Sequence, residues 1–458
     1  MRERLYLRLR ATIYNMRGGF LIRPFLIALV FGTVGALLSF AEEYAPEINA
    51  WIPLALFPAH QDPQVALTIL SGIANSIMTV VSIVFAILLM TLTLASTQFS
   101  PRILVSFVRD KATQWTLGIF LGTFCYCMAA LPAVRAFPIP FVPVLTVLIG
   151  MALALVCVGW LIFFINHISR SISVNHIVDR IARETELVIE EIMPHRRGPY
   201  ERSLQTPTAR DGRERIIVSR ASGYIRFVDV RFLVDCAKSF GVEIHLERRV
   251  GHFVPAGAPI MRVADSGRVT PERQERLLSA IDIGPARTMQ QDVEFGIIQI
   301  VDIALRAISP AVNDPTTAIN CVDQLCRIVI VWAARAPAER FMYGPPHVLR
   351  LAVPWITHDG LLDTAFEQIR HYARSDFAVS LRLLRAFEDI VAAGASPREA
   401  ASLVERARRV VSGCEQALPT YDVEALQDRF AGLEAQVSDI LISTGFGTDF
   451  QEFWLALN

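Results

Sequence analysis

The most constraining feature of this sequence is a long segment without a charged side chain, which runs from Pro63 to Pro101. A helix that crosses a bilayer needs about 20 mostly apolar residues. Soluble domains do not normally build a single element longer than this without a charge. The segment therefore predicts a membrane protein, and its apolar part, from about Leu67 to Leu94, is expected to form one spanning helix.

Three further apolar stretches are long enough to span a bilayer: Phe25 to Ala41, Ala112 to Val134, and about Val142 to Ile165. The first follows a basic start, as a signal peptide would. Its apolar run is too long for the core of a signal peptide, and no convincing small-residue cleavage site follows, so we predict a retained helix. The sequence thus predicts an α-helical integral membrane domain with four transmembrane helices in residues 1–166.

Charge is divided unevenly along the chain. The 458 residues include 44 basic and 44 acidic side chains, and this balance argues against nucleic acid as a partner because nucleic-acid-binding proteins usually carry a basic excess. Residues 24–166 are nearly free of charge, whereas residues 167–458 carry most of the Arg, Asp and Glu. The charged part is long enough for one or two packed domains.

The orientation of the helices follows from the Arg and Lys residues in their short flanks. Residues 1–23 contain six arginines, whereas the first loop, residues 42–62, has four acidic residues and no Arg or Lys. The second loop is basic again, the third has only Arg135, and the fourth span ends in a basic segment. This alternation predicts that both termini are cytoplasmic.

Polar side chains lie along one face of the second predicted helix. Ser71, Asn75, Thr79 and Ser82 follow spacings of four, four and three residues, so they share a face. Such a stripe commonly joins helices within lipid; alternatively, it lines a water-filled path in an oligomer. Arg102, near the inner end, would anchor the helix at the headgroups or, as the alternative, form a basic ring at the mouth of a pore.

Small residues and cysteines indicate packing rather than chemistry. Gly118 and Gly122 form a GxxxG pattern in the third predicted helix, which favours close helix packing first and an oligomer contact second. The seven cysteines form no CxxC pair, so we interpret them as buried, reduced thiols and predict no metal site.

The charged part is predicted to be a cytoplasmic α+β region with a small β-barrel-like module and a helical bundle. A continuous helix from His167 to about Met193 is expected to carry the fourth span outward, so residues 167–215 are interpreted as a stalk and linker. Residues 216–265 indicate short strands around one helix and resemble half of a biotinyl- or lipoyl-type barrel. The hairpin tip lacks the Lys that such carriers need, so no carrier chemistry is predicted. Residues 266–458 are predicted to be mainly helical.

Two amphipathic helices joined by the turn SPAVNDP carry the candidate residues for a ligand or ion site. Acidic clusters can bind a divalent cation or act in acid–base chemistry, although carboxylates on exposed helix faces are usually only solvated. On the first helix, Asp302 and Arg306 are four residues apart and can pair, and Asn313 or Asp314 can cap the second helix. The candidates for a ligand or ion site are Asp292, Asp302, Arg306, Asn313 and Asp314.

No enzymatic motif is present in the sequence. It contains no Walker motif, GxGxxG, HExxH or GxSxG, so we predict no enzyme, no catalytic residue and no cofactor. His358 and Asp359 precede a predicted helix start, where a cap is the favoured interpretation and a catalytic dyad the alternative. The four predicted spans show no buried charged residue, which would have favoured a proton-coupled transporter.

Three motifs resemble those of one family. SPAVNDPTTA, the preceding DVEFGIIQIVDIALRA and the membrane motif STQFSPR are similar to the motifs of a bacterial family of predicted integral membrane proteins of unknown function. The resemblance covers almost the whole chain. It implies a membrane protein with a cytoplasmic C-terminal region, and it implies no activity and no catalytic residue.

Two functional hypotheses follow for this polytopic protein of the bacterial inner (plasma) membrane. The first is a homo-oligomeric channel or transport pore with a cytoplasmic regulatory domain. The alternative is a membrane-anchored sensor or scaffold that binds a ligand or a protein through its cytoplasmic domain. The expected partners are the lipid bilayer, further copies of the chain, and an ion or small-molecule ligand.

Overall fold

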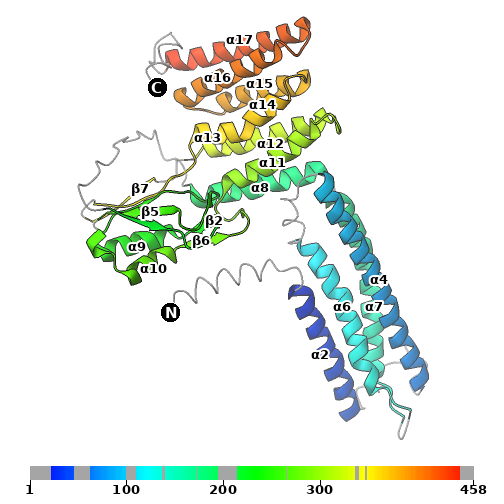
Figure 1. Ribbon diagram of the computed structural model, residues 1–458. Coiled ribbons are helices and arrows are strands. Elements are labelled where there is room, and N and C mark those ends of the chain that lie inside the picture. Colours follow the sequence, from blue (N-terminus) through cyan, green and yellow to red (C-terminus); the bar gives the residue numbers. More distant parts are fainter. Residues whose placement is uncertain are drawn as a thin grey trace. The chain divides into compact units, whose positions relative to one another are not determined.

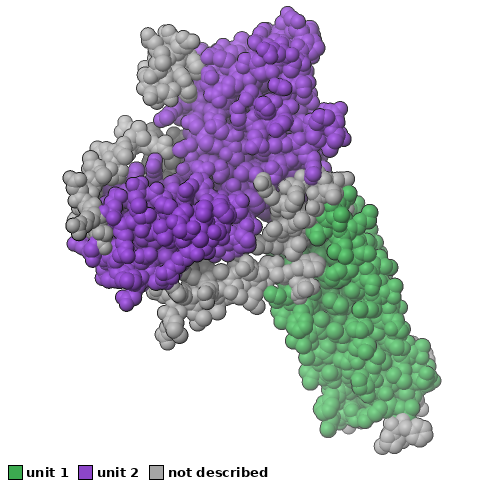
Figure 2. Space-filling view, viewed as in Figure 1, with its two compact units in different colours: residues 1–173 green, residues 174–458 purple. Residues whose placement is uncertain are grey.

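The computed structural model divides the chain into two compact units, residues 1–173 and residues 174–458 (Figure 2). It describes residues 22–45, 62–98, 110–136, 140–171, 173–193, 214–264, 266–335, 340–345 and 348–443.

The first unit consists of four long apolar helices (Figure 1). They are α2 (Ile22–Tyr44), α4 (Pro63–Gln98), α6 (Lys111–Ala130) and α7 (Val144–Ser171), and a short 3-10 turn, η2 (Leu131–Ala133), follows α6. Each of the four is long and apolar enough to cross a membrane. The predicted membrane domain with four transmembrane helices is confirmed in its architecture.

Helix α6 is the best-covered helix of this unit, because it packs against the other three. Gly118 and Gly122 of α6 lie directly beneath Ile27 and Phe31 of α2: a Cβ added at either glycine would come within 2.5 and 2.8 Å of those side chains. On α2, a Cβ at Gly35 would lie 2.7 Å from the backbone oxygen of Tyr126. The GxxxG pattern therefore serves a close contact between helices within one chain.

Helix α4 covers the opposite side of α6 with an apolar face. Its buried side chains, including Leu70, Ile77 and Val84, pack in two clusters with residues of α6 and α7 such as Tyr126 and Phe164. Several polar groups in this interior form hydrogen bonds, as buried polar groups generally do. The Tyr126 hydroxyl donates to the Thr146 carbonyl at 3.0 Å, and the Trp160 indole donates to Thr116 Oγ1 at 2.9 Å.

The second unit begins with helix α8 (Val174–Ile192), which differs from the predicted stalk. The single helix expected from 167 to about 193 is two helices, because α7 ends at Ser171 and α8 begins at Val174. Helix α8 packs against α11 (Val293–Ala307) and α12 (Pro315–Ala333) and buries its apolar face there. Arg327 of α12 also pairs with Glu186 and Asp179 of α8. The apolar residues of this segment thus pack within the second unit.

The β module consists of two sheets that share one apolar core. Residues near the predicted range supply β1 (Arg215–Val218), β2 (Gly223–Val228), β3 (Ile244–Leu246), β4 (Phe253–Val254) and β5 (Pro259–Val263). Later parts of the chain add β6 (Ile281–Gly284), β7 (Phe341–Gly344) and β8 (Val348–Ala352), and β8 pairs in parallel with β3. The sheet orders are β1-β5-β3-β8-β7 and β4-β2-β6. Helices α9 (Val230–Phe240) and α10 (Pro271–Leu278) accompany them.

The rest of the second unit is helical, and its helices stack in successive layers (Figure 1). After α12 come α13 (His358–Leu362), a π-helical turn η4 (Asp363–Glu367), α14 (Gln368–Tyr372), α15 (Phe377–Ala392), α16 (Pro397–Cys414) and α17 (Thr420–Ser443). Contacts run from α12 to α15, from α15 to α16 and from α16 to α17. The combination of a four-helix membrane part with an α+β region is the predicted fold class, which is confirmed.

Candidate functional site

The predicted polar stripe of α4 faces away from the other three membrane helices. Ser71 is half-buried, and Asn75, Thr79 and Ser82 are exposed on the surface of the unit. The hydroxyls of Ser71, Thr79 and Ser82 donate to carbonyls of their own helix, four residues back, at 2.6, 3.0 and 3.0 Å. The stripe therefore does not join α4 to its neighbours within the chain. Arg102, the fifth predicted pore residue, lies outside the described residues.

The burial pattern shows that the stripe is longer than the sequence pattern indicated. A row of small or uncharged polar side chains, spaced alternately by four and three residues, is exposed along α4. We name this row the α4 seam; it comprises Thr68, Gly72, Asn75, Thr79, Ser82 and Ala86. Alternating spacings of four and three are those of a helix seam that contacts another helix, and small residues allow two such helices to approach closely.

The five predicted ligand residues do not form one site. Asp292 precedes α11 and Asp314 follows it, so the helix separates them by about 22 Å at 1.5 Å per residue. Asp302 and Arg306 lie between them on α11, one turn apart and half-buried. Among the described residues, no group of three or more His, Cys, Asp or Glu side chains is placed to hold a metal ion.

Asn313 and Asp314 have local structural roles, as the capping interpretation predicted. Asn313 adopts the left-handed region, with φ of 50°, which Asn tolerates better than most residues. The carboxylate of Asp314 caps α12 by accepting from the Thr317 amide at 3.1 Å and the Thr317 hydroxyl at 2.6 Å. These two bonds hold the pKa of Asp314 below its ordinary value.

Asp292 instead belongs to a half-buried charge cluster that joins the β module to the helices. It caps α11 at the Phe295 amide, and it also accepts two bonds from Arg287, at 2.7 and 2.8 Å. Glu294 accepts from Arg249 at 2.9 Å and from Arg287 at 3.2 Å. The side chain of Asp292 is only 3% exposed. We name Arg249, Arg287, Asp292 and Glu294 the junction cluster.

The junction cluster is closely packed and reaches the π-helical turn. The hydroxyl of Thr364 in that turn donates to Glu294 at 3.2 Å. Gly251, with φ of 88°, lies so close that a Cβ there would be 2.5 Å from Asp292 Oδ2, which leaves no room for a side chain. Burial disfavours the charged form of Arg287, but its bonds to the two carboxylates outweigh this and raise its pKa.

A buried acid in the membrane unit was missed by the sequence analysis. Glu42 was assigned to the first loop, but it lies in the last turn of α2 and is fully buried. Its carboxylate accepts from the Leu145 and Thr146 amides at 3.1 and 2.7 Å and from the Thr146 hydroxyl at 2.5 Å. The expectation that the spans contain no buried charged residue is therefore wrong. A carboxylate at the start of α7 is stabilised by the free amides and dipole of that helix end.

The comparisons with known proteins agree with the architecture. Residues 17–389 match the model of a family described as Predicted membrane protein (DUF2254). The chain belongs to this family. The resemblance inferred from the three motifs is thereby confirmed.

Relatives of the chain are found among curated mycobacterial proteins. It is 31% identical over 369 residues to Uncharacterized protein Rv1290c of Mycobacterium tuberculosis (strain H37Rv), a match that covers 79% of this chain and 68% of the relative. Uncharacterized protein Mb1321c of Mycobacterium bovis matches with the same identity and coverage. No solved structure matches the chain. The descriptions of the family and of these relatives state no activity, so membership of the family supports only a location in a membrane for this chain.

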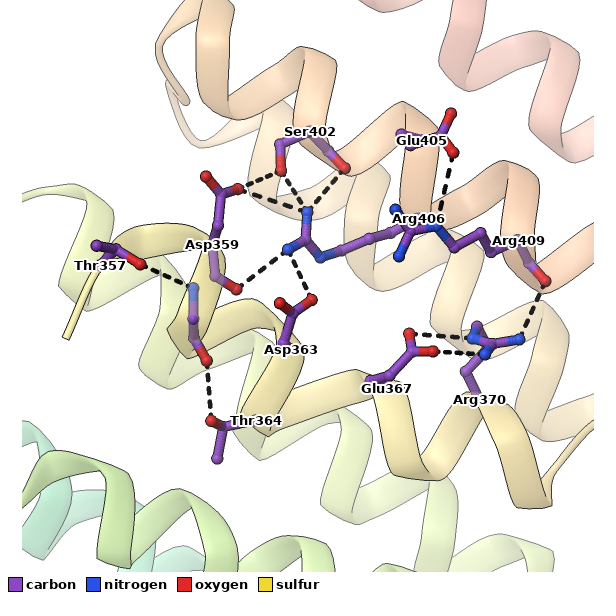
Figure 3. Close-up of polar contacts among 11 residues, drawn as sticks. Thr357, Asp359, Asp363, Thr364, Glu367, Arg370, Ser402, Glu405, Arg406 and Arg409 are labelled. Atoms are coloured by element: carbon purple, nitrogen blue, oxygen red, sulfur yellow. Dashed lines mark hydrogen bonds and ion pairs between the residues drawn. The ribbon is translucent and has the colours of Figure 1, made fainter. Parts of the chain in front are cut away.

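The second polar cluster lies partly beyond the family match, which ends before α16. Figure 3 shows Arg406 of α16 pointing between Asp359, Asp363 and Ser402. The guanidinium donates to Asp363 at 2.8 Å and to the Asp359 carbonyl at 3.1 Å, and it also contacts the Ser402 hydroxyl. That hydroxyl donates to Asp359 at 2.5 Å. The arginine thus fastens α16 to α13 and the π-helical turn.

His358 is neither a helix cap nor half of a hydrogen-bonded dyad. Thr357 caps α13 by accepting from the Gly360 amide at 3.1 Å. Within the described part of the chain, neither ring nitrogen of His358 has a hydrogen-bond partner, and its nearest carboxylate is Glu399, 3.6 Å from Nδ1. Burial lowers the pKa of His358. The imidazole of His358 is therefore packed among charged side chains and neither caps the helix nor forms a hydrogen-bonded dyad.

Proposed function

We propose that the protein is a homo-oligomeric membrane pore in which the α4 helices of several copies surround a common axis. The observation that supports this proposal is the α4 seam, which is exposed along the helix and contains no charged side chain. The amide of Asn75 is poorly suited to hydrocarbon, because a polar group without a partner is costly there. Further copies of the chain would give this face polar or aqueous neighbours.

The proposed pore is uncharged over the length of the seam. Hydroxyl and amide groups can replace part of an ion's hydration shell, and the hydroxyls of Thr79 and Ser82 would be near the axis. Their bonds to the helix backbone use the hydroxyl hydrogen and leave the oxygen lone pairs directed outward. Such a pathway favours small ions. The basic residues that follow α4 in the sequence would lie at the cytoplasmic mouth of the pore.

The cytoplasmic unit is proposed to regulate this pore. Only residues 172 and 173 separate α7 from α8, so a movement of α8 is transmitted to a membrane helix through a very short connection. Helix α8 is held to α12 by Arg327 and by a buried apolar face. We further propose that both termini are cytoplasmic and that the membrane is the bacterial inner membrane, because the basic residues alternate between loops.

Ion flux tests the proposal directly. Purified protein in liposomes is expected to pass K⁺, Na⁺ or Cl⁻ faster than empty liposomes do. A charged, membrane-impermeant thiol reagent is expected to reduce this flux in Thr79→Cys and Ser82→Cys, which place a thiol on the proposed axis. Leu155→Cys is the matched control, because Leu155 is exposed but lies on α7 and not on α4. Flux no greater than that of empty liposomes, or equal inhibition of all three variants, contradicts the proposal.

A membrane-anchored sensor is the second candidate function, and the junction cluster favours it. This cluster connects two loops of the β module, through Arg249 and Arg287, with α11 and the π-helical turn. A ligand that moved the β module would therefore act on the helices through these contacts. A sensor is expected to show a ligand-dependent thermal shift without ion flux. A ligand screen with no shift and no co-purifying partner counts against this candidate.

A further inference from the structure

The membrane unit has an apolar groove of about 640 Å³ where α2 packs against α6. Residues that line it include Pro24, Phe25, Gly32 and Ala36 from α2, with Leu121 and Cys125 from α6. The groove exists because Ala28, Gly32 and Ala36 recur every four residues on one face of α2 and carry almost no side chain. All of the lining residues belong to one chain, so the groove forms without a second copy of the protein.

The length of the groove corresponds to one leaflet of a bilayer. From Pro24 to Ala36, helix α2 rises about 18 Å at 1.5 Å per residue. The hydrocarbon core of a bilayer is about 30 Å thick, so one leaflet contributes about 15 Å. A groove that begins at one end of a span and stops near mid-bilayer matches a single acyl chain better than a helix of a partner protein, which would cross both leaflets.

A positively charged side chain lies next to the end of the groove that is formed by Pro24. Arg23 directly precedes the lining residue Pro24. Helices α2 and α6 run parallel, because Ile27 contacts Gly118 and Phe31 contacts Gly122, four residues further on in each helix. The end marked by Arg23 is therefore also the end at which α6 begins with Lys111. Among the described residues, no carboxylate forms an ion pair with Arg23.

We propose that this groove binds one acyl chain of an anionic phospholipid, whose phosphate is bound by Arg23. An arginine at the end of a span extends toward the headgroups, and its planar fork matches phosphate oxygens. Anionic lipids are concentrated in the cytoplasmic leaflet, on the side where the proposed orientation places Arg23. The bound lipid covers the groove-lining side chains of α2 that stay exposed in the described chain, such as Phe25, Leu29 and Ala36.

Native mass spectrometry of the full chain tests this proposal with two synthetic lipids of the same chain length, phosphatidylglycerol and phosphatidylcholine. The wild-type chain is expected to retain one phosphatidylglycerol per protomer, in preference to phosphatidylcholine by on the order of tenfold, as a charge-assisted hydrogen bond allows. Arg23→Gln is expected to remove this preference, whereas Arg170→Gln, which removes a basic residue from the end of α7, is expected to keep it.

A second pair of variants tests the acyl-chain half of the site. Thr33→Leu with Ala36→Leu fills the groove from exposed positions and is expected to lower retention of both lipids. Val34→Leu is the control, because Val34 is exposed on the same helix outside the groove. Equal retention of the two lipids by the wild type, or equal retention by the filled and control variants, identifies surrounding bulk lipid only and overturns the proposal. If the filled variant does not fold, the Arg23→Gln comparison alone decides.

Discussion

Helices α6 and α4 both carry a row of small residues at helical spacing, but the glycine pair of α6 is covered whereas the α4 seam is exposed. Gly118 and Gly122 of α6 are filled by Ile27 and Phe31 of α2, whereas Gly72 of α4 has no atom within 4 Å of the place where its Cβ would be. The same kind of sequence pattern thus produces a closed contact on one helix and an open face on the other. The difference indicates where the chain is complete by itself and where a further partner is expected.

The polar groups of the two regions differ in the same way. On the covered side, Glu42 is fully buried and its carboxylate is saturated by donors from α7. On the open side, Asn75 and Thr79 point out of the unit. Buried polar groups must be paired within the protein, whereas exposed ones require a solvent that suits them. In a membrane, the α4 seam therefore indicates an aqueous or protein neighbour more strongly than an exposed stripe would in a soluble protein.

The largest effect is expected from adding one methyl group to the covered contact. In Gly35→Ala the new Cβ would lie 2.7 Å from a backbone oxygen of Tyr126, so the helices must separate. Overpacking of this kind destabilises a core by about 1–3 kcal/mol. Faster thiol labelling of the buried Cys127 and Cys157, resolved by mass spectrometry, measures this loss.

The matched substitution on the open helix is Gly72→Ala, which meets no neighbour. It is expected to leave the labelling unchanged or to slow it, because Ala favours a helix over Gly by up to about 1 kcal/mol. Similar acceleration in Gly35→Ala and Gly72→Ala would show that the two faces are equally covered, and the comparison between α6 and α4 would then fail.

The next effect is expected at the buried acid. Glu42→Gln replaces an acceptor of three hydrogen bonds with an amide that accepts through one oxygen, and leaving buried donors unmatched costs about 1–3 kcal/mol. Its neighbour Glu43 pairs with Arg135 while about 40% exposed, and such a pair contributes at most about 1 kcal/mol. Glu43→Gln is therefore the control. Equal changes in the labelling of Cys127 would mean that Glu42 does not hold α2 to α7.

The spans themselves were predictable because bilayer thickness sets a length that an apolar run must reach. The predicted range from Phe25 to Ala41 falls inside α2, and the range from Leu67 to Leu94 falls inside α4. Which face of each helix is covered was not predictable. Ser and Thr hydroxyls can bond to the backbone of their own helix, so these residues occur both on covered faces and on exposed faces. Glu42 was missed for a related reason: an acid beside a second acid at a helix end looks like the start of a loop.

The fold class of the second unit was predictable from the sequence, but its connectivity was not. The strands β1 to β5 carry local signals, but β6, β7 and β8 lie apart from them in sequence and join through pairings such as Ile244 with Leu351. The sequence likewise placed Asp292 among the candidate ligands without its partners. Arg287 binds both Asp292 and Glu294, and only the fold brings Arg249, which lies 45 residues before Glu294, to the second of these carboxylates. Local patterns predict elements, whereas the pairing of distant residues depends on the whole chain.

A smaller effect is expected at Asp110, the residue that directly precedes α6. Asp110 caps α6 at the Thr113 amide and contacts His167 of α7 at 3.0 Å. Although burial raises the pKa of Asp110, the bonds from Thr113 and the proximity of His167 lower it by more. Loss of such a cap in Asp110→Ala costs about 0.5–2 kcal/mol, which faster labelling of Cys157 would report.

The pH dependence of this cap has a definite sign. Because the folded-state pKa of Asp110 lies below the ordinary value of about 3.9, its stabilisation is complete above that value and is lost as the pH falls through the folded-state pKa. The wild-type chain is therefore expected to lose protection of Cys157 in acid more steeply than Asp110→Ala does. Parallel pH profiles for the two chains would show that the cap contributes nothing.

The smallest effect on folding, and the sharpest test of the open face, is expected from Asn75→Leu. Substitution of an exposed residue usually changes stability by less than about 0.5 kcal/mol, so the labelling of buried cysteines should not change. If α4 helices meet around an axis, however, Asn75 contributes one polar contact from every copy. Native mass spectrometry is expected to find a ring of several subunits for the wild type and fewer subunits for Asn75→Leu. The control is Met78→Leu, because Met78 is exposed on α4 outside the seam, and it is expected to form the same ring as the wild type. A monomeric wild-type chain would mean that lipid covers the seam, and the sensor would then be the better proposal.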